Sequence, residues 1–85
     1  MAIICYDPDF LRTFNKLDKS IKIKVEKALI KIIEYPETGK PMRYTRKGTR
    51  EVYVSPFRLS YAYIPSENKI IILNLYHKDE QQYKK

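Results

Sequence analysis

The spacing of the apolar residues changes once along the chain, at Tyr35-Pro36. Before this point apolar side chains recur about every 3.6 residues, which is the period of one face of a helix. After it they recur at every second residue, as along one face of a strand. Proline lacks an amide hydrogen and its ring clashes with the preceding turn, so a helix is not expected to continue through Pro36. The sequence therefore predicts a helical first half and a β-rich second half.

The first half predicts one strand followed by two helices. Residues 2–6 are apolar and stop at Asp7-Pro8, where Asp7 can cap a helix whose first position suits Pro8. After a second break, either Asp18 or Ser20 can cap the next helix. The apolar stripe of this helix is broad and its lysines lie outside it, so we expect it to pack on a sheet and assign its lysines to no site.

The second half predicts four strands joined by short turns. Val52 and Val54 fall on one face of their strand, and Glu51 and Tyr53 on the other. The order β-α-α-β-β-β-β, with short turns between the later strands, implies an antiparallel meander with two helices on one face. We therefore expect an α+β fold in a single domain, residues 1–85, with a short C-terminal tail. The expected later strands are residues 42–46, 50–55, 57–64 and 69–76.

Length and composition exclude several classes of protein. A chain of 85 residues is too short for a two-domain enzyme with a large cofactor cleft. It contains one cysteine and one histidine, which excludes an intramolecular disulfide and a structural zinc site within one chain, and we expect neither metal nor cofactor. No apolar run is long enough to span a bilayer and no secretory signal is recognisable, so the expected location is the cytoplasm without membrane contact.

The positive charge is concentrated in the second half. Residues 1–34 carry seven basic and five acidic side chains, whereas residues 35–85 carry ten and five. Tyrosines 44, 53, 61 and 63 are interleaved with the basic residues, a combination that suits single-stranded RNA, since cations bind phosphates and tyrosine rings stack on bases. A solvated charged face with tyrosines packed at the core edge remains the alternative. The candidate RNA-binding residues are Lys40, Arg43, Arg46, Lys47 and Arg50.

The end of the chain carries the residues best suited to proton transfer. The ordinary pKa of histidine is near neutral, so His77 is a candidate acid or base, although it could instead bond a neighbouring backbone group. Lys78 can offer a phosphate a fixed charge, and Tyr83 can stack on a base or exchange a proton. Cys5 is expected to be a small buried apolar residue.

Four stretches together resemble the RelE/ParE toxin superfamily, and more specifically its RelE-like mRNA interferases. The most specific of them is the run from Phe57 to Tyr61, which is similar to an aromatic-Arg-aliphatic-x-Tyr strand of the family. The resemblance implies a small twisted antiparallel sheet with two helices packed on it. It also implies the toxin of a type II toxin–antitoxin pair, which cuts mRNA in the ribosomal A site. The four stretches are FNKLDKSIKIKVEKALIKIIEYP, GKPMRYTRKGTREVYV, SPFRLSYAY and IIILNLYHKDEQQY.

The same resemblance implies catalytic roles. Arg58 falls on the strand arginine that contacts the scissile phosphate in the family. His77 or Lys78 falls where the family has a second basic residue, and Tyr83 lies near its C-terminal tyrosine. The expected chemistry is metal-free: the RNA 2′-hydroxyl attacks the adjacent phosphate and leaves a 2′,3′-cyclic phosphate, with the assignment of base and acid left open.

The chain departs from the family at two positions. Glu51 and Tyr53 stand where basic residues are common. These departures keep open a non-catalytic module that binds RNA or the ribosome. A ParE-like toxin that inhibits DNA gyrase is the other alternative, although the tail with His77, Lys78 and Tyr83 argues against it. The implied partners are the ribosome with its mRNA and a cognate acidic, RelB-like antitoxin, with a toxin–antitoxin heterotetramer as a possible assembly.

Overall fold

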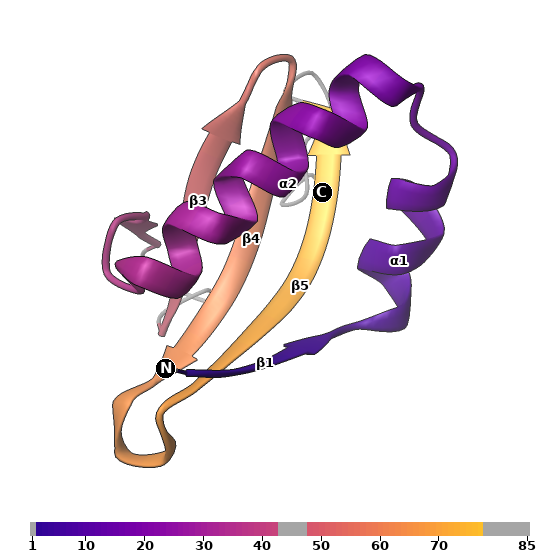
Figure 1. Cartoon of the computed structure of the whole chain (residues 1–85). Coiled ribbons are helices and arrows are strands. Elements are labelled where there is room, and N and C mark those ends of the chain that lie inside the picture. Colours follow the sequence, from indigo (N-terminus) through magenta and orange to yellow (C-terminus); the bar gives the residue numbers. More distant parts are fainter. Residues whose placement is uncertain (1, 43–47, 78–85) are drawn as a thin grey trace, which may run out of the picture.

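The computed structural model describes residues 2–42 and 48–77. Two helices cover one face of a five-stranded sheet with strand order β1-β5-β4-β3-β2 (Figure 1). Helix α1 contacts β5, and α2 contacts β3. The elements are β1 (Ile3–Tyr6), α1 (Pro8–Asn15), α2 (Lys19–Glu34), β2 (Lys40–Pro41), β3 (Thr49–Val54), β4 (Phe57–Ile64) and β5 (Lys69–His77), with a short 3-10 helix (Pro65–Glu67) between β4 and β5.

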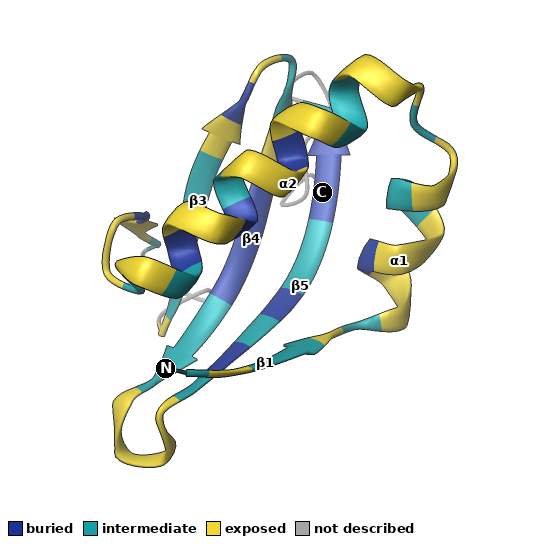
Figure 2. Cartoon of the chain, viewed as in Figure 1, coloured by how far each residue is buried: buried dark blue, intermediate teal, exposed yellow. Residues whose placement is uncertain are grey.

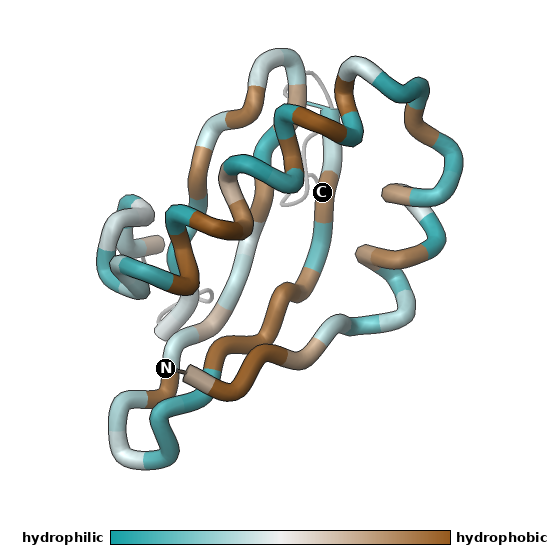
Figure 3. The backbone as a smooth tube through the Cα atoms, viewed as in Figure 1, coloured by the Kyte–Doolittle hydropathy of each residue, from teal (hydrophilic) through white to brown (hydrophobic). Residues whose placement is uncertain are grey.

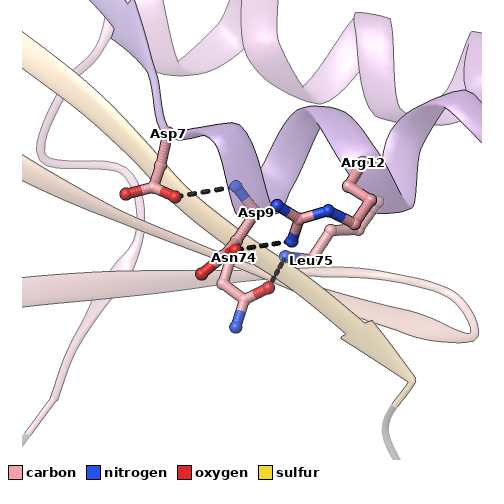
Figure 4. Close-up of polar contacts among 5 residues, drawn as sticks. All are labelled: Asp7, Asp9, Arg12, Asn74 and Leu75. Carbon is pink, nitrogen blue, oxygen red and sulfur yellow. Dashed lines mark hydrogen bonds and ion pairs between the residues drawn. The ribbon is translucent and has the colours of Figure 1, made fainter.

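Both helices begin at the aspartates that the sequence indicates. The Asp7 carboxylate accepts a hydrogen bond from the Asp9 amide at 2.8 Å, with Pro8 in the first turn of α1 (Figure 4). Asp18 caps α2 by accepting from the Ile21 amide at 3.1 Å. Each carboxylate satisfies an amide that has no partner within its helix. Of the two caps considered for α2, Asp18 is therefore the one used.

The predicted α+β architecture is confirmed, but the sheet is mixed rather than wholly antiparallel. Strand β1 runs parallel to β5, with Ile3 opposite Lys69, and the other pairs are antiparallel. No hairpin fixes the direction of β1, because the chain passes from it directly into α1. It pairs with the most apolar strand of the chain, although Ile3 and Tyr6 remain exposed and the two residues between them are half-buried.

The first described strand of the second half begins earlier than expected. The sequence predicts a strand over residues 42–46, whereas β2 consists of Lys40 and Pro41 alone. Met42 lies outside the strand, and residues 43–47 are outside the described part of the chain. Lys40 faces Glu51 in the β2–β3 register. The pairing therefore begins earlier than expected, at the first residues that the preceding connector brings beside β3.

The two faces of the sheet differ in what covers them. On the helix-bearing face the side chains of the core are almost completely inaccessible (Figure 2), and apolar residues follow the inner side of α2 and the length of β5 (Figure 3). Successive residues of a strand point to opposite faces, so residues that alternate with this core lie on the second face, which we call the open face. The largest fully buried side chains are Tyr61, Phe10, Ile32, Leu59, Ile70, Ile72, Leu75 and Val25.

One irregularity interrupts the β4–β5 pairing. Ser60 is opposite Asn74, but Tyr61 is opposite Ile72, so β5 contains one extra residue at this point. The Asn74 side chain accepts a hydrogen bond from the Leu75 amide at 2.8 Å, next to the irregularity (Figure 4). Neither of the two α-helices is long and apolar enough to cross a membrane.

Candidate functional site

Arg58 lies on the open face, in the strand between β3 and β5. Its neighbour Leu59 is fully buried beneath the helices, so the pleat directs Arg58 the other way, where its side chain is 44% exposed. Tyr53 of β3 and Tyr76 of β5 are its cross-strand partners. Cross-strand partners share a face, so an arginine stands here between two tyrosines.

A carboxylate holds the guanidinium of Arg58. Glu51 Oε1 lies 3.1 Å from Arg58 Nη1, and its other oxygen, Oε2, accepts a hydrogen bond from the Tyr76 hydroxyl. The Glu51 side chain is only 10% exposed, so both oxygens are engaged in a largely desolvated position. Charge-assisted hydrogen bonds of this kind fix geometry more strongly than neutral ones. We refer to Glu51, Tyr53, Arg58 and Tyr76 as the open-face cluster.

Tyr53 is the exposed aromatic member of the open-face cluster. Its exposure is 53%, and the Arg58 guanidinium carbon lies 5.8 Å from the centre of its ring. The Tyr53 hydroxyl makes a long hydrogen bond, 3.4 Å, to the hydroxyl of Ser55. A cation at this distance is attracted by the ring. The ring is therefore placed beside the guanidinium with much of its surface in solvent.

The structure does not bring His77 to Arg58. His77 is opposite Phe57, and the two rings meet edge to face with centres 5.5 Å apart. Phe57 packs against the core, so His77 is on the helix-bearing face while Arg58 is on the open face. Lys78 and Tyr83, the remaining candidate catalytic residues, lie outside the described residues. Two of the four candidate catalytic residues are therefore described, and they lie on opposite faces of the sheet: Arg58 on the open face and His77 on the helix-bearing face.

The candidate RNA-binding residues are also divided between the faces. Lys40 is exposed and faces Glu51 across the β2–β3 pair, so it shares the open face with Arg58. Arg50 is opposite Tyr61 and therefore lies on the helix-bearing face. Arg43, Arg46 and Lys47 lie outside the described residues.

Arg50 is bound to the chain itself. Its Nη1 donates hydrogen bonds to the backbone carbonyls of Glu37, at 3.1 Å, and Gly39, at 2.8 Å. A guanidinium has no acceptor capacity and a fixed fork of donors, so it suits such paired carbonyls. The contacts hold the connector between α2 and β2 against β3. Arg50 has this structural role in addition to any contact with RNA.

Tyr61 holds the same connector from the adjacent strand. Its hydroxyl accepts from the Gly39 amide at 2.9 Å and donates to the Pro36 carbonyl at 2.7 Å. Burial raises the pKa of Tyr61, against the lowering effects of the Gly39 amide and the Arg50 charge. A Cβ at Gly39 would lie 2.7 Å from the Tyr61 hydroxyl oxygen, so no other residue fits there without a shift. The expected stacking of bases on Tyr61 is wrong, because its ring is fully buried.

Sequence reasoning treated Glu51 only as a departure from a family pattern. The contact between Glu51 and Arg58 could have been predicted from the short turn at Ser55-Pro56. This turn pairs Val54 with Phe57 and so fixes the β3–β4 register. That register places Glu51 diagonally across from Arg58 on the same face. The described residues contain no group of three or more His, Cys, Asp and Glu side chains that could hold a metal ion.

Comparison with known proteins gives one family match and a consistent set of structural relatives. Residues 4–82 match the model of the ParE toxin of type II toxin–antitoxin systems (parDE). The isolated E. coli RelE toxin is similar in structure, with a TM-score of 0.80 and 17% identity over 96% of this chain and 89% of that one. A search of curated protein sequences gave no match.

Two further relatives extend this comparison. The RelBE2 toxin–antitoxin complex of Mycobacterium tuberculosis matches with a TM-score of 0.81 and 23% identity, over 91% of this chain and 98% of that chain. A toxin from Agrobacterium tumefaciens described as YoeB/ParE matches with a TM-score of 0.78 and 11% identity, over 88% and 96%. At these identities the structural matches establish a shared fold.

Proposed function

The chain belongs to the ParE toxin family of type II toxin–antitoxin systems, within the RelE/ParE superfamily, and from this premise we propose that it cleaves mRNA in the ribosomal A site. The observation that supports cleavage is the pairing of Arg58 with Glu51 on the face of the sheet opposite α1 and α2. An arginine and a carboxylate in contact provide a group that binds phosphate and a group that accepts a proton.

In the proposed reaction the RNA supplies its own nucleophile. The 2′-hydroxyl oxygen attacks the adjacent phosphorus, its proton passes to a base, and the bond from phosphorus to the 5′-oxygen breaks. The products are a 2′,3′-cyclic phosphate and a fragment with a 5′-hydroxyl, which takes a proton from an acid. Arg58 stabilises the charge that builds on the phosphate oxygens. Glu51 is the base that the geometry favours, since its carboxylate contacts Arg58 directly.

The acid comes from the end of the chain in this proposal. The candidates from the sequence are His77, Lys78 and Tyr83, but His77 lies on the helix-bearing face, away from Arg58, so we propose Lys78 or Tyr83 as the donor. That donor would serve the leaving 5′-oxygen, while Lys40 adds a cation on the open face. We include Arg43, Arg46 and Lys47 as contacts to the RNA backbone, which would contribute affinity that falls with salt, but not Arg50, which is bound to the connector.

The ribosome is the positioning partner in this proposal. An 85-residue chain offers little surface to align a long substrate, and in-line geometry contributes much of the acceleration of such a reaction. The toxin then acts in the cytoplasm. An acidic antitoxin resembling RelB is the proposed inhibitor, because opposite charge favours its association with a chain of net charge +7. A heterotetramer of two toxins and two antitoxins is the proposed assembly.

The test is induced expression followed by primer extension on a reporter mRNA. Wild-type toxin is expected to give breaks in phase with codons, and Arg58→Ala to lose them. Arg12→Ala is the matched control, because Arg12 also pairs with a carboxylate, Asp9, but on the surface of α1. Circular dichroism checks that both variants fold. Breaks of equal intensity in wild type and Arg58→Ala would contradict the proposal, as would cleavage of RNA that carries a 2′-deoxy sugar at the break.

A ParE-like toxin that inhibits DNA gyrase is the second candidate. It is favoured by the match of residues 4–82 to the ParE toxin model and by Glu51 and Tyr53 standing where basic residues are common in RelE-like nucleases. Growth arrest with intact mRNA and DNA damage would support this candidate. Absence of any toxicity would instead favour a non-catalytic module that binds RNA or the ribosome.

A further inference from the structure

Tyr53 is the most exposed tyrosine in the described strands of the sheet, ahead of Tyr6 at 41%. The ring of Tyr61 is buried in the core, and Tyr76 is only 8% exposed with its hydroxyl on Glu51. Tyr53 is 53% exposed: it pairs with Arg58 of β4 on one side, and on the other side the two residues of β2 pair only with Arg50 and Glu51. A large apolar ring on a strand is usually covered, because covering it stabilises the fold. The exposed ring is therefore accessible to a ligand.

The surroundings of this ring fit one class of ligand. Arg58 is its direct cross-strand partner, and the guanidinium lies 5.8 Å from the ring centre. A cation and an aromatic face at this separation match the two parts of a nucleotide, since phosphate binds the first and the base stacks on the second. The hydrogen bond to Ser55 restrains the hydroxyl end of the ring, which reduces the entropy lost when a base stacks.

We propose that Tyr53 forms a nucleobase subsite, in which a base of single-stranded RNA next to the phosphate held by Arg58 stacks on the exposed ring. The proposal rests on the RNA-directed function above and adds how the substrate is recognised. Stacking needs no hydrogen-bond pattern on the base, so this subsite tolerates different sequences. It favours purines over pyrimidines, because their larger rings cover more of the tyrosine.

The subsite is tested by binding of short nucleic acids that cannot be cleaved. Adenine and cytosine dinucleotides with 2′-deoxy sugars are titrated into the folded toxin while the aromatic ring protons are followed by NMR. In the wild type the Tyr53 ring protons are expected to shift upfield, and the adenine dinucleotide to bind more tightly. Tyr53→Ala should weaken its binding at least tenfold, whereas Tyr53→Phe, which keeps the ring, should stay within about twofold of wild type.

Tyr35→Ala is the matched control. Tyr35 is 65% exposed at the C-terminal end of α2, away from the open-face cluster, so its loss should leave binding of the adenine dinucleotide unchanged. Equal affinity of Tyr53→Ala and wild type, or no Tyr53 ring shift in the wild type at saturating dinucleotide, would overturn the subsite. So would a Tyr53→Ala variant that binds the dinucleotide normally but loses affinity for the antitoxin, because the ring would then serve a protein partner.

The readouts separate this subsite from the proposed function. If wild-type toxin makes no breaks in mRNA but binds the dinucleotide through Tyr53, cleavage fails and the subsite stands. If cleavage is normal and Tyr53→Ala changes neither binding of the dinucleotide nor the toxin concentration needed for half-maximal cleavage on ribosomes, the subsite fails and cleavage stands.

Discussion

Two arginines of neighbouring strands show how differently the two faces of this sheet use the same side chain. Arg50 points to the helix-bearing face, where backbone carbonyls of the connector accept its hydrogen bonds. Arg58 points to the open face, where it pairs with a carboxylate and keeps much of its surface in water. The first stabilises the fold and the second is available to a ligand. The two arginines differ in role because their side chains point to opposite faces of the pleated sheet.

The largest expected effect is on catalysis by the open face. Replacing Glu51 by Gln keeps the shape of the side chain but removes the proposed base, so the rate of mRNA cleavage should fall by about 10²–10⁴-fold. Cleavage is measured on programmed ribosomes, and thermal unfolding reports stability. If Glu51→Gln cleaves as fast as wild type, the base must come from elsewhere, and Tyr83→Phe becomes the next variant to compare.

The helix-bearing face should instead control stability. Leu59 and Arg58 are adjacent but point to opposite faces, and Leu59 is fully buried. Leu59→Ala should therefore lower the free energy of unfolding by about 2–5 kcal/mol, since it removes core contacts and leaves a cavity. Denaturant unfolding followed by circular dichroism measures this loss. Arg58→Ala is expected to cost much less, and equal losses from the two variants would remove the distinction between the faces.

A smaller loss of stability is expected from the connector. Tyr61→Phe keeps the buried ring but leaves the Gly39 amide and Pro36 carbonyl without this partner, which should cost about 1–3 kcal/mol. Tyr53→Phe loses only the long bond to Ser55 at an exposed site and should change stability by less than about 0.5 kcal/mol. Parallel denaturant titrations compare them. A Tyr61→Phe variant as stable as wild type would show that the connector is held by Arg50 alone.

The smallest effect concerns alkaline pH. Burial raises the pKa of Tyr61 in the folded state above its ordinary value of 10.0, so the unfolded chain loses this proton first as the pH rises. The folded state then holds more protons, and its stability falls with increasing pH. This contribution is complete below the ordinary pKa and is lost as the pH rises through the folded value. The pH dependence of unfolding above pH 10.0 should therefore be shallower for Tyr61→Phe than for wild type.

The helices and strands could be predicted from the sequence where residues close together in the chain determine them. Asp7 with Pro8, and Asp18, were sufficient to begin the helices, because caps act within one turn. Alternation in residues 57–64 gave both the strand and its buried face. The direction of β1 could not be predicted in this way, since it depends on pairing with β5, a strand distant in the sequence.

The candidate site was less accessible to sequence reasoning, because its residues meet only across strands. Arg58 was identified through the family resemblance, but its pairing with Glu51 follows from the strand register. The grouping of Arg58 with His77 ignored the pleat, which sends Tyr76 and His77 to opposite faces. Arg50 was assigned with the other basic residues, since nothing local indicates that carbonyls of the connector surround it.

Gly39 shows that a position can be intolerant of change without taking part in chemistry. Any side chain there would meet the Tyr61 ring at 2.8 Å and the Arg50 Cβ at 3.1 Å. In a scan of all substitutions this glycine should tolerate as few residues as Arg58, yet its variants should fail by losing folded protein rather than by losing activity per molecule. Abundance and toxicity measured together would tell these two kinds of constraint apart, whereas invariance among relatives would not.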